Sequence, residues 1–444
     1  MKPAGPPNIL ALLALLASGG LVAAVAGDPH DQGDDPLTQE ELDRLTVAIK
    51  ADIEELRGVE FPRDVPCSVA GPDTFREYVF EQLEKISSKE EVEAEGSAMK
   101  LLGLLPADMD LLETQLEVFE QVVAGFYDPT SEGFTIMPTI HGDIARITLA
   151  HELTHALDDQ LYDIDGTKEK RIGNGDAQWA YHAVVEGSGM AVMNQWTIRH
   201  AAEIDLEELL EFEEMSRVGL DEVPAFLWKP ALGTYLRGSA FLVRSTSVLQ
   251  GSMRAPERDD LHRAFTEPPL SSEQVLHPEK YWDEEQRDDP VAVEIDAERL
   301  PEGWEVLYED TLGEFALALV VEDLKKRNRG MPESAMALMG MKFTNKAAEG
   351  WGGDRFVLLG KDDARLLHLA TVWDSERDAE EFHEALVDLA DHLKESVQAY
   401  AEEVEVGEPG RGLMREKDRV FLTLGFGAEP ELYLTASSWA RFVE

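Results

Sequence analysis

The chain has 444 residues, enough for two or three domains, and 43% of them are hydrophobic, which is sufficient for an ordinary globular core. Its 89 acidic residues outweigh its 40 basic ones, giving a formal net charge of −49 that is spread along the whole length. Such a surface repels nucleic acid and anionic membranes, so we expect neither as a partner. The composition leaves the oligomeric state open.

The N-terminus has the features of a secretory signal peptide. An apolar, uncharged run at 9–26 follows Lys2 and ends in Ala24-Val25-Ala26, small residues that suit cleavage. A retained membrane anchor is the alternative, because a run of this length can just span a bilayer. The small residues favour removal of 1–26. We therefore expect an exported protein (periplasmic, surface-bound or secreted) with no membrane span after cleavage.

A helical N-terminal region is predicted at 37–123, after a short acidic linker at 27–36. Thr38-Gln39-Glu40-Glu41 is a capping box, and it predicts a helix that ends near Arg57. The proline-rich segment that follows is expected to be extended or looped. Further helices in this region are predicted after Asp73, at 91–104 and at 110–123.

At the start of the second region, 124–282, the spacing of apolar residues changes from a helical pattern to a strand pattern. Ala124–Pro129 leads into a turn that ends at Gly133, and Phe134–Met137 has the pattern of a short strand. The two segments predict a hairpin. Its edge strand is the kind of element to which an extended peptide can add.

The strongest motif in the sequence is His151-Glu152-Leu153-Thr154-His155. Two histidines four residues apart lie on one helical face, so both imidazoles can bind one metal ion. Glu152, about 100° round the helix from His151, can lie beside a metal-bound water and take its proton. The spacing predicts a catalytic site for one Zn²⁺ per chain. A surface helix with two unrelated histidines is the alternative interpretation.

The helix that carries this motif is expected to begin at Asp143, as its N-cap, and to end near Gln160. Leu149, Leu153 and Leu157 should form its buried stripe, with the histidines on the other side. A loop rich in glycine and charge should separate it from the next helix.

Glu186 is the residue that we expect as the third zinc ligand, 31 residues after His155. It lies on a helix that Asp176 should cap. Gly187 and Gly189 would allow this helix to approach the first one closely, which explains glycine in a helix interior. An exposed helical glutamate is the alternative, but the apolar neighbours of Glu186 argue against it.

Two residues are expected to support the ligands. Asp159, one turn after His155, is placed to accept the free N–H of a ligand imidazole and fix its tautomer. Asp158 is the alternative for this role, and a solvated aspartate at the helix end is the non-functional one. His182, one turn before Glu186 on the same face, competes as a ligand and is otherwise expected beside the ligands.

A mixed α+β C-terminal domain is predicted at 291–444, after a charged linker at 283–290. Its helical and strand patterns alternate. The helices are expected at 312–326 and 376–401, and the strands at 356–359, 366–373 and 420–424.

The two histidines with Glu186 on a second helix resemble the gluzincin class of zinc metallopeptidases. More closely, the chain resembles a set of uncharacterised exported bacterial proteins of peptidase type. This resemblance covers roughly residues 70–285, and it implies a mainly helical, zincin-like catalytic domain. Gluzincins carry an aspartate four residues after the ligand glutamate, where this chain has Met190. The segments that carry the resemblance are Ala124–Pro129, His151–Gln160, Val185–Gly187 and Pro268–Tyr281, extended by Gly350–Arg355 and Thr371–Ser375.

The resemblance implies hydrolysis by a promoted water. Zinc would polarise the scissile carbonyl, and Glu152 would deprotonate the water and then protonate the leaving amine. The oxyanion of the tetrahedral intermediate needs a further donor. His277, in a rigid proline-rich loop, is the first candidate and Tyr235 the second. The alternative is a structural role, in which His277 forms a hydrogen bond with a loop carbonyl.

The sequence therefore predicts an exported zinc metalloendopeptidase that acts on polypeptides. A zinc hydrolase of another substrate is one alternative, and a surface protein that holds zinc without catalysis is another. Glu152 argues against the last, because a structural zinc site needs no base and is usually closed by cysteines. The region 37–123 would be a removable pro-segment in a latent enzyme, but its last helix runs directly into the predicted strand.

Overall fold

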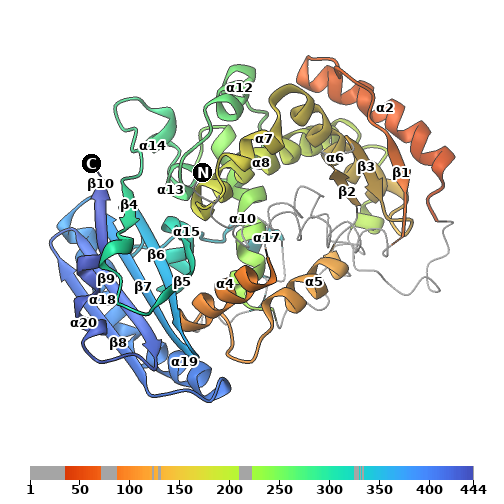
Figure 1. Ribbon diagram of the computed structural model, residues 1–444. Helices are drawn as coiled ribbons and strands as arrows, with labels where there is room; N and C mark the ends of the chain where they lie inside the picture. Colours follow the sequence, from red (N-terminus) through yellow and green to blue (C-terminus); the bar gives the residue numbers. More distant parts are fainter. Residues whose placement is uncertain are drawn as a thin grey trace.

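The chain has a mixed α+β fold, in which a mainly helical part lies beside a part built on an antiparallel sheet (Figure 1). The predicted fold class is confirmed. The predicted signal peptide lies outside the described residues. The computed structural model describes residues 36–71, 88–122, 125–128, 132–209, 223–324, 330, 332 and 335–443.

The first described helix is α2 (Gln39–Arg57), which begins and ends as the sequence predicts. The Thr38 side chain accepts a hydrogen bond from the backbone N–H of Glu41 at 3.3 Å. Gly58, with φ of 61°, ends the helix in the left-handed conformation that glycine adopts without strain. The buried face of α2 packs against two long helices at the centre of the helical part.

A small three-stranded sheet with the order β1-β3-β2 lies beside these helices. Strands β2 (Gly125–Asp128) and β3 (Gly133–Ile136) are antiparallel, as the predicted hairpin requires. Strand β1 (Cys67–Val69) comes from the proline-rich segment and pairs with β3 in parallel. Strand β2 is therefore an edge strand of the described sheet.

The two central helices are α6 (Gly142–Tyr162) and α8 (Gly175–Arg199), and α8 also packs against α10 (Ala225–Leu242). The predicted stripe of Leu149, Leu153 and Leu157 on α6 is buried, but the opposite side of the helix is buried as well. Its residues are buried on every side from Ile144 to Asp158, with the exception of Arg146. The physical reason is that α2, α8 and the small sheet cover α6 from different directions.

Neither central helix is capped by the predicted aspartate. The backbone N–H of Asp143 lies inside the first turn of α6 and donates to the Glu208 carboxylate at 3.0 Å. Asn174 caps α8, whereas the carboxylate of Asp176 accepts the backbone N–H of Ser272 at 3.0 Å. In both cases the aspartate is engaged by a tertiary partner that local sequence cannot show.

Shorter helices complete the helical part. The predicted helices at 91–104 and 110–123 correspond to α4 and α5, and the predicted loop after α6 contains α7. The helix expected after Asp73 lies outside the described residues. These helices are α4 (Lys89–Leu101), α5 (Leu111–Val122), α7 (Ile164–Glu169), α11 (Val248–Met253), α12 (Arg258–Thr266), α13 (Ser272–Leu276) and α14 (Glu279–Trp282).

The C-terminal part is built on a five-stranded antiparallel sheet with the order β5-β6-β7-β9-β8. The three predicted strands are its central ones. The two edge strands were not predicted, because their sequences, EVLYED and PGRGLMRE, mix charged residues with few apolar ones. The strands are β5 (Glu305–Asp310), β6 (Trp351–Lys361), β7 (Ala364–Trp373), β8 (Pro409–Glu416) and β9 (Arg419–Phe426).

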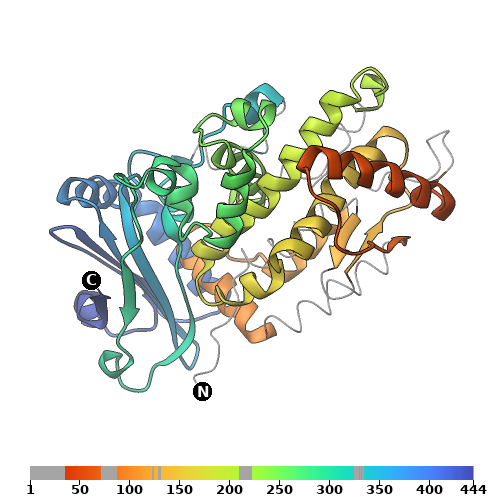
Figure 2. The ribbon, with the colours of Figure 1, turned by 90° about the horizontal axis from the view of Figure 1, so that it is seen from above.

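Helices pack on this sheet, and a second, two-stranded sheet lies next to it (Figure 2). The predicted helix at 376–401 is divided into α18 and α19, which pack against β7, β8 and β9. Of the segment 37–123, α2 packs on α6 and α8, whereas α4 packs on β5 and α19. The remaining elements include β4 (Ala292–Ile295), α15 (Gly313–Val320), α17 (Ala335–Met339), α18 (Glu376–Asp388), α19 (Ala390–Glu403), α20 (Leu432–Thr435) and β10 (Ala440–Val443).

The predicted linker at 283–290 contains no helix or strand and connects α14 to β4. It is nevertheless held in place. The Lys280 ammonium donates to three carboxylates, those of Glu273 at 2.6 Å, Asp288 at 2.8 Å and Asp374 at 2.8 Å. These contacts join the linker to both parts of the molecule.

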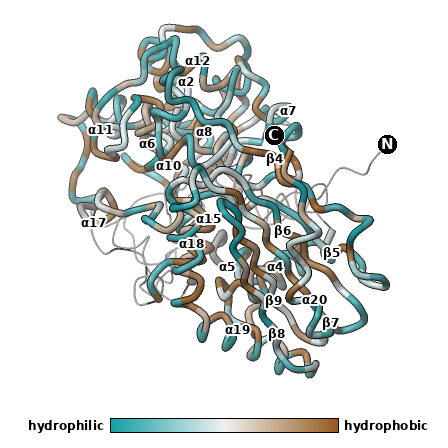
Figure 3. Tube along the Cα trace, turned by 90° about the vertical axis from the view of Figure 1, so that its left-hand side faces the viewer, coloured by the Kyte–Doolittle hydropathy of each residue, from teal (hydrophilic) through white to brown (hydrophobic). Residues whose placement is uncertain are grey.

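Hydrophilic stretches are distributed over both parts of the molecule rather than gathered at one end (Figure 3). This distribution agrees with the spread of acidic residues along the sequence. Within the described part of the chain, no helix has the length and apolarity needed to cross a membrane.

His368, at the centre of the five-stranded sheet, should make the protein sensitive to acid. It is fully buried, its Nδ1 lies 3.1 Å from Oγ1 of Thr423, and burial lowers its pKa to about 3. The unfolded imidazole titrates near 6.5, so this contribution to stability is present above pH 6.5 and is lost as the pH falls towards 3. Between pH 7.5 and 5 the parent protein should lose about 2 kcal/mol more of its free energy of unfolding than His368→Gln.

Urea unfolding followed by tryptophan fluorescence at both pH values measures this difference. The exposed His262, changed to Gln, is the matched control and should follow the parent. Equal losses in His368→Gln and the parent would contradict the prediction.

Candidate metal centre

The structure brings together the three predicted metal ligands, two from α6 and one from α8. Nε2 of His151 lies 3.1 Å from Oε2 of Glu186 and 2.9 Å from Nε2 of His155. Nε2 of His155 lies 3.5 Å from the same glutamate oxygen. One atom from each residue can therefore face a single ion, because all three lie within 4.8 Å of one another.

The three side chains are shielded from solvent, with exposed fractions of 1% for His151, 1% for His155 and 0% for Glu186. Burial, helped by the neighbouring imidazole, lowers the pKa of His151 and favours its neutral form. Burial opposes the charge of Glu186, but His155 and His151 outweigh it and lower the pKa of this carboxyl. Neutral imidazoles and a carboxylate form the donor set that Zn²⁺ takes in catalytic sites.

Glu152 lies next to this group and is itself fully buried. Neither of its carboxylate oxygens has a hydrogen-bond partner among the described residues. Burial, followed by the charge of Glu186, raises the pKa of Glu152 well above its usual value. An unpaired buried carboxyl is energetically costly, which makes Glu152 a candidate functional group.

Gly187 and Gly189 explain how the backbone of α8 comes close to its neighbours. A Cβ atom on Gly189 would lie 2.6 Å from Cε1 of His151 and 2.9 Å from Cε1 of His155. A Cβ atom on Gly187 would instead lie 2.4 Å from the backbone carbon of Gly238 on α10. Gly189 therefore allows the close approach of α8 to the two histidines. Gly187 instead allows the close approach of α8 to α10, a helix that the sequence did not indicate.

Two of the predicted site residues lie directly against the ligands. The Tyr235 ring, on α10, is stacked on that of His151 with the centroids 5.7 Å apart and an angle of 23°. Nε2 of His182 lies 3.4 Å from Oε1 of Glu186, and burial lowers the pKa of His182 to about 3. His182 thus takes the position beside the ligand glutamate that the helical spacing indicates.

The predicted role of Asp159 is not what the structure shows. Its carboxylate accepts a hydrogen bond from the Tyr127 hydroxyl at 3.1 Å and from the backbone N–H of Ile164 at 3.0 Å. Its described hydrogen bonds therefore tie β2 and α7 to α6 and do not orient an imidazole. At this point of the helix the side chain points towards β2 rather than towards α8.

His277 also has a different partner from the one predicted. Its Nε2 lies 2.9 Å from Oε1 of Glu314, at the start of α15, and Thr344 donates to the same oxygen. The preceding residue is held by Arg237, which donates to the Leu276 carbonyl at 2.9 Å. The described contacts therefore engage His277 with a buried carboxylate, and none of them joins it to the metal group.

Asp158 was expected to be solvated if it had no role, but it is fully buried. It accepts hydrogen bonds from Arg57 at 2.6 Å and from the Ser188 hydroxyl at 2.5 Å. Sequence reasoning did not find Arg57, since an arginine 101 positions before its partner carries no local signal.

Comparisons with known proteins reach only the other part of the molecule. The family model described as "Domain of unknown function (DUF8575)" matches residues 299–428. This range contains all five strands of the five-stranded sheet and begins after α6 and α8. Curated proteins and solved structures gave no match to the chain.

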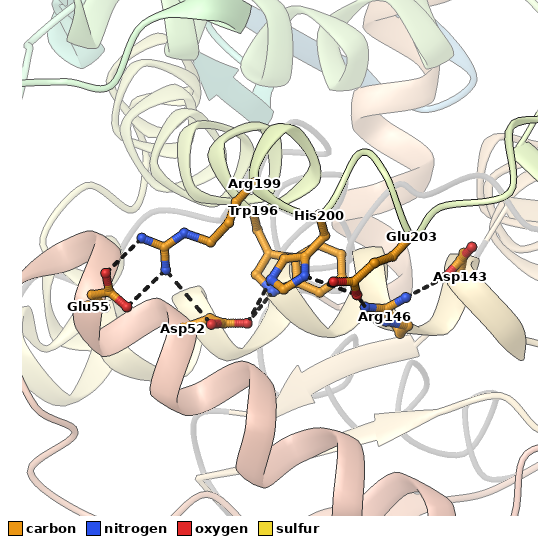
Figure 4. Close-up of polar contacts among 8 residues, drawn as sticks. All are labelled: Asp52, Glu55, Asp143, Arg146, Trp196, Arg199, His200 and Glu203. Carbon is orange, nitrogen blue, oxygen red and sulfur yellow. Dashed lines mark hydrogen bonds and ion pairs between the residues drawn. The ribbon is translucent and has the colours of Figure 1, made fainter.

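The purified protein should bind one Zn²⁺ per chain through the three ligands. His155→Ala and Glu186→Ala should each weaken binding by more than about 100-fold, because removal of a ligand should exceed the effect of removing an outer partner. Competition with a chromophoric chelator measures the affinity. His200→Ala is the control, since His200 contacts Asp52 and Glu203 at the far end of α8 (Figure 4). Unchanged affinity in both ligand variants would show that the three residues do not hold the ion.

Gly189→Ala tests the close approach of α8 to the histidines. Alanine normally stabilises a helix by about 1 kcal/mol relative to glycine, but here the added methyl group meets both imidazole rings. We expect zinc affinity to fall by at least about tenfold. Gly96→Ala in α4 is the matched control, because its methyl group would meet only the Leu111 side chain at 3.3 Å. A Gly189→Ala protein with parental affinity would disprove this account of the glycine.

Proposed function

We propose that this protein is an exported zinc metallopeptidase that hydrolyses peptide bonds in polypeptides. The observation that carries the proposal is the buried carboxyl of Glu152, which has no hydrogen-bond partner among the described residues and lies next to two histidines and a glutamate. A purely structural zinc site has no use for such a base. Export is supported by the signal-like sequence of residues 1–26.

The proposed chemistry divides between the ion and the chain. A bound Zn²⁺ would polarise the scissile carbonyl and lower the pKa of water. A carboxylate oxygen of Glu152 takes the proton of the attacking water and later delivers it to the leaving amine. Its position, next in the chain to His151 and without another partner among the described residues, leaves its oxygens available for both transfers.

We assign the role of oxyanion donor to Tyr235 rather than to His277. The phenol ring of Tyr235 stacks on the imidazole ring of His151, and its hydroxyl is a hydrogen-bond donor. His277 is bound to Glu314 instead.

The small sheet supports a polypeptide as the substrate. Strand β2 lies at its described edge, packs against the metal helix α6 and is tied to it by the hydrogen bond from Tyr127 to Asp159. An extended peptide can add to such an edge through main-chain hydrogen bonds. This arrangement would hold the peptide along the helix that carries the histidines.

Glu152→Gln should abolish hydrolysis while zinc remains bound. Removal of a general base lowers kcat by about 10²–10⁴-fold, and the amide retains the shape of the side chain. The measurement is the degradation of casein by residues 27–444 in moderate salt with added zinc, with zinc content determined in parallel. Glu169→Gln, an exposed glutamate on α7, is the matched control and should cleave like the parent.

Cleavage by the parent that a chelator abolishes, and that Glu152→Gln lacks, would establish the peptidase. Cleavage that persists in Glu152→Gln would refute the assigned base. A parent that binds zinc but cleaves nothing would favour the zinc-holding binding protein over the peptidase.

A further inference from the structure

A closed ring of hydrogen bonds joins α2 to both helices of the metal centre. Arg57, in the last turn of α2, donates through Nη2 to Oδ1 of Asp158 at 2.6 Å and through Nη1 to Oγ of Ser188 at 3.2 Å. The Ser188 hydroxyl donates to the other oxygen of Asp158 at 2.5 Å. The side chains of Arg57 and Asp158 are 9% and 0% exposed, and Ser188 is also buried.

The ring lies next to the metal ligands in both helices. Asp158 follows His155 by three residues on α6, and Ser188 follows Glu186 by two residues on α8. At 1.5 Å of rise per residue, each is within about one helical turn of a ligand. A shift of α6 relative to α8 would therefore change this ring and the distances among the ligands together.

A contribution to stability is a poor explanation for this buried ring of Arg57, Asp158 and Ser188. A buried ion pair often contributes little net stability, because desolvation of the charges offsets their attraction, whereas it can specify how elements are arranged. The planar guanidinium of Arg57 has two donors in a fixed geometry, which sets the spacing between Asp158 and Ser188. A lysine could keep the charge but not this geometry.

We propose that Arg57 is a positioning residue of the metal centre, which sets the spacing of α6 and α8 through Asp158 and Ser188. It follows that α2 is part of the metal centre and not a removable cover. This inference rests on the proposed metal site.

The structure offers a matched control at the C-terminal end of α8 (Figure 4). Arg199 donates to Glu55 of α2 at 3.0 Å, and Trp196 donates to Asp52 of α2 at 3.0 Å. These contacts also fasten α2 to α8. Arg199, however, follows Glu186 by 13 residues, about 20 Å along the helix. Loss of this pair should loosen α2 without moving the ligands.

The experiment compares Arg57→Leu, Arg57→Lys and Arg199→Leu in residues 27–444. Zinc affinity is measured by competition with a chromophoric chelator, ligand geometry by the visible spectrum of the Co²⁺ form, and stability by thermal unfolding without metal. Both Arg57 variants should lose roughly 10–100-fold in zinc affinity and change the Co²⁺ spectrum. Arg199→Leu should lower the unfolding temperature and leave affinity and spectrum unchanged.

The inference would be overturned if Arg57→Lys kept the zinc affinity and the Co²⁺ spectrum of the parent and only its unfolding temperature fell. Arg57 would then have a structural role alone. Ser188→Ala, which removes one hydroxyl, gives the same readout if the arginine variants do not fold. A parent protein that binds no zinc would instead refute the proposed metal site itself, so the two failures are distinguishable.

Discussion

The close contact of α6 with α8 is the constraint on which the rest of the molecule depends. The side chains of His151, His155 and Glu186 face one point because α8 passes close to the two imidazole rings. A side chain at position 189 would collide with these rings, so glycine is needed there. This contact places His151 and His155 against Glu186. Helix α2 and the small sheet pack against α6, and α10 packs against α8, so that the two helices are covered on their other sides.

Burial of the central helices makes every unpaired polar group informative. The buried carboxylate of Asp354, in the C-terminal part, accepts hydrogen bonds from the backbone N–H groups of Leu312 at 2.9 Å and Gly313 at 2.8 Å. Glu152 has no such partner among the described residues. This difference is the reason for which we propose a chemical role for Glu152.

The sequence was most informative where chemistry depends on local spacing. The four-residue interval of the histidines determines their common face, and the apolar neighbours of Glu186 correctly indicated its burial. Prediction from the sequence failed where the contacts of a residue depend on a partner far away in the chain. Asp159 turns towards β2, the start of α6 binds Glu208 rather than a local cap, and the polar edge strands of the large sheet take their conformation from their neighbours. None of these interactions leaves a periodic pattern in the chain.

The contact between the two parts of the molecule has a consequence for the boundaries of the recognised family. Asp310 and Arg355 both lie within residues 299–428, yet they bind the turn that begins α8: Asp310 accepts the N–H of Gly175 at 2.8 Å, and Arg355 donates to the Gly173 carbonyl at 2.7 Å. The matched segment is therefore joined by two hydrogen bonds to the start of the helix that carries Glu186. A fragment cut to residues 299–428 would lose both of these hydrogen bonds.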